Sequence, residues 1–182
     1  MYVGILASAS NDINDYYVSI ATSVASYLAS NEYNLVFGGS NNSMMGACYR
    51  EFRNKGRNVL AIANKKYADE LNELDKASSV ICETTFDVKK EIFENSDVLV
   101  VLPGGIGTFS ELFSFIEENR SNDKNIPIEI YDEDGYYLPF IEQLQMLVVN
   151  NFADPSILGS FKVSHDKEEF IEHMSLYSKG ED

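Results

Sequence analysis

The sequence predicts an α/β fold in which a doubly wound, mainly parallel sheet carries helices on both faces. Short apolar runs alternate along the chain with segments of helical period, which is typical of strands joined by crossover helices. Two of the predicted strand-to-helix connections contain consecutive glycines. The length of 182 residues suits one domain, residues 1–182, because no linker rich in proline, glycine or serine divides the chain.

The first half of the chain alternates strands and helices. The predicted elements are a strand at 2–7, a helix at 15–28, a strand at 34–37, a helix at 44–52, a strand at 58–63 and a polar connection at 65–76. Val18, Ala21 and Val24 recur at helical spacing in the first of these helices. Gly56 fits the end of the second helix.

The second half continues the pattern. Its predicted elements are a strand at 79–82, a helix at 87–94, a strand at 97–102, a helix at 109–119, a strand at 126–131, a helix at 137–150, and a short strand with an amphipathic helix within 160–174. The strand at 97–102 is the most hydrophobic run in the chain. Residues 178–182 are expected to fray.

Composition limits the classes of partner. The net charge of −15 argues against nucleic acid and anionic membranes, because the molecule as a whole repels phosphate polymers. Cys48 and Cys82 lie in no Cys-x-x-Cys or Cys/His cluster, so neither a disulfide framework nor a zinc site is expected. The apolar start of the chain is too short for a signal peptide, and no apolar run is long enough to span a bilayer. We therefore expect a cytoplasmic protein.

Residues 103–108, Pro-Gly-Gly-Ile-Gly-Thr, connect a buried strand to a helix. An open α/β sheet binds its ligand at such connections, outside the carboxyl ends of the strands. Glycines allow close approach of the backbone and positive φ angles, and the free N–H groups of the helix start bind phosphate. The sequence therefore predicts a nucleotide phosphate at this glycine loop, although a tight turn without a ligand is the alternative.

Thr108 and Glu111 also match a capping box, in which the two side chains satisfy free N–H groups at a helix start. A carboxylate used in this way has less freedom to face a substrate. The sequence leaves open whether Glu111 is a cap or a catalytic group.

Several other polar side chains have two interpretations. Ser8 and Ser10 follow the first strand, and Ser40, Asn41, Asn42 and Ser43 follow Gly38 and Gly39 after the second strand. These side chains either bind a ribose or base, or cap the following helix. The adjacent Lys89 and Lys90 are typical of a solvated helix surface, and His165 and His173 are expected at the surface without partners.

The motifs resemble those of the Lonely Guy family, a family long labelled as lysine decarboxylases. Residues 103–111 match its Pro-Gly-Gly-x-Gly-Thr-x-x-Glu motif. Residues 37–39 with 44–46 are similar to its Tyr-Gly-Gly-Gly…Leu-Met-Gly segment, and residues 134–137 to its Asn-x-x-Gly-Tyr-Tyr turn.

The resemblance implies a Rossmann-like fold, a homodimer and cleavage of the N-glycosidic bond of nucleoside 5′-monophosphates, such as cytokinin riboside monophosphates or AMP. The products are the free base and ribose 5-phosphate, and no metal or redox cofactor is implied. Carried over, Glu111 faces C1′ of the ribose and stabilises positive charge as the base departs, and Lys89 assists. The substrate-binding residues implied are Ser8, Gly38, Gly39, Met45, Pro103, Gly104, Gly105, Gly107 and Thr108.

One departure from the family pattern favours an alternative function. The family carries an Arg–Lys pair within a segment like Met-His-Glu-Arg-Lys. A gapless count from Pro103 places Val88 at the arginine and Lys89 at the lysine, whereas a one-residue gap places Lys89 and Lys90 there. Ser110 also replaces the usual first glutamate of a Glu-Glu pair. The alternative is a non-catalytic protein of the same fold that binds a nucleotide or molybdenum cofactor.

The missing family arginine can also be supplied by another arginine of the chain across a dimer interface. The candidates are Arg50, Arg53, Arg57 and Arg120. The helices at 44–52 and 109–119 carry apolar residues beyond one stripe, which fits either a second subunit or a thicker core within one chain.

Overall fold

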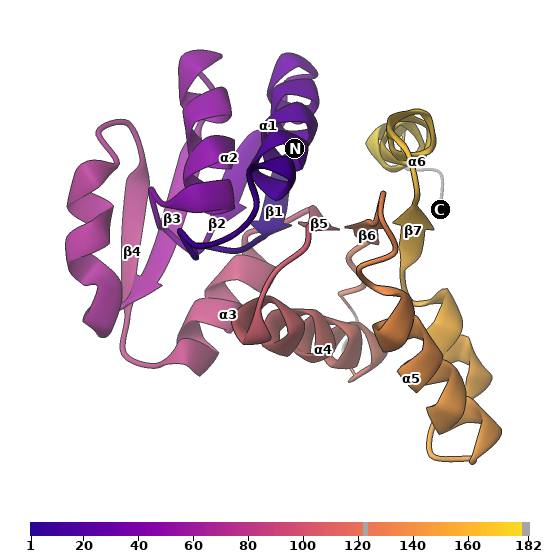
Figure 1. Ribbon diagram of the computed structural model, residues 1–182. Helices are drawn as coiled ribbons and strands as arrows, with labels where there is room; N and C mark the ends of the chain where they lie inside the picture. The colour runs from indigo at the N-terminus through magenta and orange to yellow at the C-terminus, as the bar shows by residue number, and fades with distance from the viewer. Residues whose placement is uncertain (122–123, 180–182) are drawn as a thin grey trace.

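The computed structural model describes residues 1–121 and 124–179, and their strands form one parallel sheet in the order β4-β3-β2-β1-β5-β6-β7. The strands are β1 (Tyr2–Leu6), β2 (Asn34–Phe37), β3 (Val59–Asn64), β4 (Ser78–Cys82), β5 (Val98–Val101), β6 (Ile128–Tyr131) and β7 (Lys162–Ser164). The helices are α1 (Asp15–Ser30), α2 (Ser43–Asn54), α3 (Thr85–Glu94), α4 (Ile106–Ser121), α5 (Leu138–Val149) and α6 (Lys167–Lys179). Helices α1, α2 and α6 cover one face and α3, α4 and α5 the other, which confirms the predicted fold class (Figure 1).

The central strands are apolar on both faces because helices cover both. All four residues of β5 are buried, and alternate residues enter opposite cores: Val98 and Val100 pack with α1 and α2, whereas Leu99 and Val101 pack with α3, α4 and α5. This is why the strand appears in the sequence as a continuous apolar run.

Some boundaries differ from the expectations. The polar connection at 65–76 contains a 3₁₀ helix, Lys65–Glu73. Helix α4 begins at Ile106, three residues before the predicted start. Helix α6 continues to Lys179, so Ser178 is helical, and residues 180–182 lie outside the described residues.

The extra apolar residues of α2 and α4 pack within the chain. Helix α2 buries residues against α1 and the sheet, and the Phe109 ring of α4 lies 5.4 Å from the Tyr137 ring and 6.0 Å from the Phe140 ring. A thicker core within one chain accounts for these residues. Phe113 is more exposed, although it contacts Phe140.

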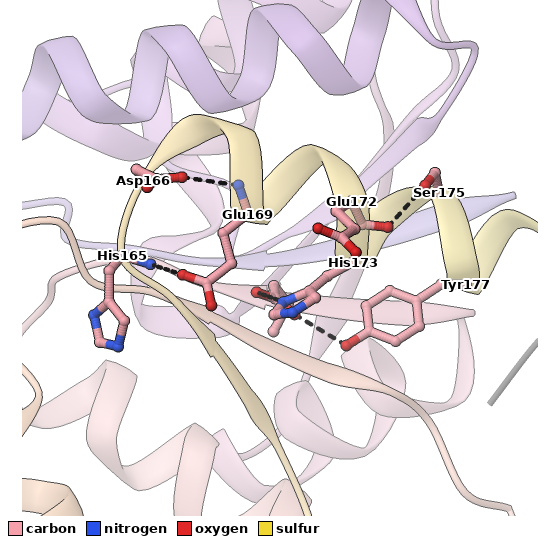
Figure 2. A network of polar contacts seen from close by, with 8 residues as sticks. His165, Asp166, Glu169, Glu172, His173, Ser175 and Tyr177 are labelled. Carbon is pink, nitrogen blue, oxygen red and sulfur yellow. Dashed lines mark hydrogen bonds and ion pairs between the residues drawn. The ribbon is translucent and has the colours of Figure 1, made fainter.

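His173 is not the unpartnered surface residue expected from the sequence. Figure 2 shows His173 and Tyr177 reaching from α6 toward the sheet. There the carboxylate of Glu129, on β6, is fully buried and lies 2.9 Å from His173 Nδ1 and 2.9 Å from the Tyr177 hydroxyl. Because a buried carboxylate requires such partners, this cluster joins α6 to the sheet.

We expect His173→Ala to lower the free energy of unfolding by about 3 kcal/mol, because the buried Glu129 then loses one of the two hydrogen-bond donors that the described residues supply. Urea denaturation measures the change. His165→Ala is the matched control: His165 is exposed, although its Nδ1 lies 3.2 Å from Asp132 O, and its loss should change stability by less than about 1 kcal/mol. Equal effects of the two substitutions would contradict this role for the Glu129 cluster.

Candidate functional site

The strand order places a candidate site between β1 and β5. The chain continues from β1 to β2 on one side, whereas β5 lies on the other side of β1 and continues to β6. Ligands bind at such a switch point, beside the carboxyl ends of the strands. The connections after β1, β2, β5 and β6 meet at this edge: Met45 N–H donates to Ser8 O (3.2 Å), and the Tyr136 hydroxyl donates to Gly104 O (2.6 Å).

The glycines of the loop after β5 serve two purposes. A Cβ on Gly104 would lie 2.2 Å from Thr108 Oγ1, so only glycine fits beside the buried threonine. A Cβ on Gly105 or Gly107 would meet no atom within 4 Å, so these positions border open space. The positive φ angles expected here are absent from the loop, since the glycines with positive φ are Gly39, Gly56 and Gly135. The glycines of this loop are therefore explained by close packing at Gly104 and by open space for a ligand at Gly105 and Gly107, and not by unusual dihedral angles.

Helix α4 begins with free amide groups at the exposed end of the loop. Its first helical hydrogen bond runs from Phe109 N to Gly105 O, at 3.1 Å. The N–H groups of Ile106, Gly107 and Thr108 precede it and have no acceptor within the helix. Together with the helix dipole, these donors can hold an anion such as a phosphate. Ile106 and Gly107 are exposed and Pro103 is buried.

Thr108 and Glu111 do not form the capping box that their spacing allows. Thr108 is the third residue of α4 rather than its cap, because the helix starts two residues before it. The Glu111 carboxylate makes no hydrogen bond to a residue that the structure describes. A capping box forms instead at α3, where Thr84 Oγ1 accepts from Asp87 N–H and Asp87 Oδ2 accepts from Thr84 N–H.

Glu111 lies one helical turn beyond Gly107, on the same side of α4. Burial raises the pKa of its carboxyl from 4.5 to about 7, although the ammonium group of Lys89 acts in the opposite direction. Its proton is therefore gained and lost near neutral pH. Such a group, beside free N–H donors and at the end of the strands, is well placed for acid–base or electrostatic catalysis.

Lys89 bridges α3 and α4 and does not form a solvated pair with Lys90. Its ammonium group donates to Ser110 Oγ (2.7 Å), Ser110 O (3.3 Å) and Ser114 Oγ (3.2 Å). Lys90 is exposed and lies 3.7 Å from Glu94. Val88 packs against the core shared by α3, α4 and α5. In the gapless count, the residue at the family's arginine position therefore makes an apolar contact, and the residue at the lysine position reaches the helix of Glu111.

Three of the four candidate arginines are bound elsewhere. Arg53 forms a bidentate pair with Asp75, Arg120 pairs with Glu117, and Arg57 donates to Ala29 O near Glu32. Arg50 Nη1 lies 3.2 Å from Asn41 Oδ1 and 3.3 Å from Asn41 O. Of the four, Arg50 contacts a connection at the site edge.

The connection after β2 is shaped by packing rather than by helix capping. Gly39 has a φ of 74°, and a Cβ on Gly38 would lie 3.3 Å from the Met45 side chain. Asn42 precedes α2 without a capping hydrogen bond from its side chain. After β1, Ser8 Oγ accepts from Ser10 N–H at 3.1 Å. These residues line the edge of the candidate site beside β1.

Two tyrosines were not assigned a role from the sequence. Tyr136 and Tyr137 follow β6, and their hydroxyls donate to Gly104 O and Leu102 O, respectively, at the end of β5. The Gly-Tyr-Tyr sequence at 135–137 was the available signal. Which backbone carbonyls the hydroxyls bind depends on strand order, so it cannot be seen in the sequence alone.

Two other features of the described residues bear on the kind of site. In the described part of the chain, no helix combines the length and apolar character that crossing a membrane requires. Within the same residues, no group of three or more His, Cys, Asp or Glu side chains is arranged to hold a metal ion.

The fold and the glycine loop define a class of protein, Rossmann-like proteins with a glycine-rich strand-to-helix loop at the switch point. A family model described as "Possible lysine decarboxylase" matches residues 45–174. The chain belongs to this family, which is the Lonely Guy family indicated by its motifs.

Relatives of known name support this membership. The chain is 26% identical to a cytokinin riboside 5′-monophosphate phosphoribohydrolase of Arabidopsis thaliana, over 96% of this chain and 77% of the relative. It is 27% identical to the enzyme of that name from Mycobacterium tuberculosis, over 78% and 76% of the two chains. The molybdenum cofactor carrier protein of Chlamydomonas reinhardtii has a similar structure, with a TM-score of 0.70, 13% identity and coverage of 98% of both chains. That last likeness shows the fold alone.

We expect Gly104→Ala to lower the melting temperature, because its methyl group would overlap the Thr108 side chain and cost about 1–3 kcal/mol. Gly105→Ala is the matched control: its methyl group meets open space, and the less favourable alanine at this helix cap should cost less than about 1 kcal/mol. Thermal unfolding followed by circular dichroism measures both. A larger loss for Gly105→Ala than for Gly104→Ala would contradict this description of the loop.

Proposed function

We propose that this protein hydrolyses the N-glycosidic bond of a nucleoside 5′-monophosphate, such as AMP or a cytokinin riboside monophosphate, to the free base and ribose 5-phosphate. The observation that carries the proposal is the Glu111 carboxylate, which has no hydrogen-bond donor among the described residues and lies one turn beyond the free N–H groups of α4. The names of the Arabidopsis and Mycobacterium relatives support the same reaction.

The 5′-phosphate binds the N–H groups at the start of α4, with Pro103, Gly104, Gly105, Gly107 and Thr108 forming its cradle. Glu111 lies four positions after Gly107 in the helix, a rise of roughly 6 Å along the axis. A ligand held by its phosphate at the helix start thus extends toward Glu111. Ser8, Gly38, Gly39 and Met45 border the ligand from the side of β1 and β2.

In the reaction, the bond between C1′ and the base nitrogen breaks and its electron pair leaves with the base. Positive charge develops on the ribose, as in other glycosidic cleavages. The ionised Glu111 stabilises this charge from a partly buried position, where the interaction is stronger than in water. A water molecule supplies hydroxide to C1′ and its proton to the departing base. Lys89 holds the adjacent turn of α4 in place through Ser110 and Ser114.

The preferred ligand is a small nucleotide rather than a nucleic acid, since the net charge is −15. A homodimer and a cytoplasmic location, both expected from the sequence, stay predictions.

Binding without hydrolysis is the second candidate function. Val88 favours it, because in the gapless count an apolar side chain packed against the core stands at the position of the family's arginine. In that case a nucleoside monophosphate raises the melting temperature and is not consumed.

We expect Glu111→Gln to abolish release of base from AMP while leaving the affinity for AMP within about threefold, because the phosphate contacts are retained. Chromatography detects the base and ribose 5-phosphate, and calorimetry measures AMP binding. Glu142→Gln, an exposed substitution on α5, is the control and should keep full activity. Turnover by Glu111→Gln at the rate of the unaltered protein would overturn the assignment, and binding without turnover by the unaltered protein would establish the second candidate.

The pH dependence of kcat/KM should follow the ionisation of Glu111. The reaction requires the carboxylate, so activity rises with pH, reaches half its maximum near pH 7 and levels off above it. The phosphate of the substrate loses its second proton near pH 6. The affinity of the Glu111→Gln variant for AMP, measured from pH 6 to 8, separates the effect of phosphate ionisation from that of Glu111. An activity that is flat or falls as pH increases from 6 to 8 would contradict the carboxylate role.

A further inference from the structure

Tyr136 is the side chain that holds the peptide before the candidate phosphate site. Its hydroxyl donates to Gly104 O at 2.6 Å. Its ring lies 6.2 Å from the Phe109 ring of α4 and 6.1 Å from the Tyr17 ring of α1. Tyr17 in turn donates from its hydroxyl to Asp134 Oδ2 at 2.8 Å. The ring of Tyr136 thus contacts α1 and α4, and the residue itself belongs to the connection after β6.

A hydrogen bond to Gly104 O determines the direction of the next N–H group. The peptide between Gly104 and Gly105 is planar and trans, so its C=O and N–H point in opposite directions. Tyr136 on the oxygen side therefore directs the Gly105 N–H away from itself. Because both flanking residues are glycines, no Cβ atom restricts rotation of this peptide plane.

The same hydrogen bond also makes the peptide a better donor. A donor on the carbonyl oxygen polarises the amide and strengthens the hydrogen bond that its N–H makes. Gly105 is exposed, and the space beside its Cα is open. An anion can approach this amide without displacing a side chain.

We propose that Tyr136 is a positioning residue for phosphate binding, which acts by orienting the Gly104–Gly105 peptide toward the 5′-phosphate. The inference rests on the proposed function and extends it to a residue outside the glycine motif. Tyr136 contacts the loop through a carbonyl oxygen and acts on the ligand through the backbone.

The neighbouring Tyr137 provides a matched control. Its hydroxyl donates to Leu102 O at 2.7 Å, two residues before Gly104, and the side chain is fully buried. Its backbone N–H donates to Asp132 Oδ2 at 3.1 Å. Both substitutions to phenylalanine remove one hydroxyl bonded to a backbone carbonyl, but only that of Tyr136 touches the peptide beside the free N–H groups.

The experiment compares Tyr136→Phe with Tyr137→Phe, using AMP and adenosine as ligands. We expect Tyr136→Phe to raise KM and Kd for AMP about three- to tenfold, the effect of one hydrogen bond, with kcat changed less than twofold and adenosine affinity unchanged. Tyr137→Phe should lower the melting temperature and leave the KM for AMP unchanged. An unchanged KM in Tyr136→Phe, or an equal rise in both variants, would overturn the inference.

Hydrogen exchange of residues 104–108 without nucleotide separates this inference from the proposed function. Faster exchange in Tyr136→Phe than in Tyr137→Phe supports the positioning role, and equal exchange overturns it. If the unaltered protein neither binds nor hydrolyses AMP, the proposed function fails, and the exchange measurement still decides whether Tyr136 orients the loop.

Discussion

Burial of a parallel sheet on both faces is the constraint on which the candidate site depends. Because β1 pairs in parallel with β2 on one side and with β5 on the other, consecutive strands cannot be joined by tight turns. The chain must cross back along the sheet between strands, through a helix. All the strands therefore end at one edge, and the connections that follow β1, β2, β5 and β6 meet there. Their polar groups come from four distant parts of the sequence. The site is thus a consequence of strand order rather than of any single motif.

Within that edge, the position at which α4 begins determines the chemistry. A start at Thr108 would use the threonine and Glu111 to cap the helix and would occupy the carboxylate. A start at Ile106 instead buries Thr108 against Gly104 and leaves Glu111 one turn inside the helix. Burial then raises the pKa of the Glu111 carboxyl to about 7, so that the group changes charge near neutral pH. The tyrosine hydroxyls on Leu102 O and Gly104 O stabilise the end of β5 from which this helix starts.

The fold could be predicted because buried strands such as β5 are continuous apolar runs, and helices such as α1 show their period in the sequence. The start of α4 could not, because Thr-x-x-Glu is compatible with two helix starts, and the contact between Thr108 and Gly104 decides between them. The hydrogen-bond partners of Lys89 and His173 could not be predicted from the sequence either. Lys89 binds Ser110, 21 residues away, and His173 binds Glu129, 44 residues away. Such pairs form only when the sheet brings separate elements together.

The two departures from the family pattern lie on facing helices and compensate one another in charge. In the gapless count from Pro103, Val88 removes a cation from α3, and Ser110 removes an anion from α4, directly before Glu111. Lys89 reaches that serine with a hydrogen bond of 2.7 Å. Losing the cation alone would leave two neighbouring carboxylates with one ammonium group and would raise the cost of ionising Glu111. Losing both charges leaves one carboxylate near one ammonium group, so the ionised form that glycosidic cleavage requires stays accessible near neutral pH. In the gapless count, the paired change is therefore compatible with the proposed hydrolysis.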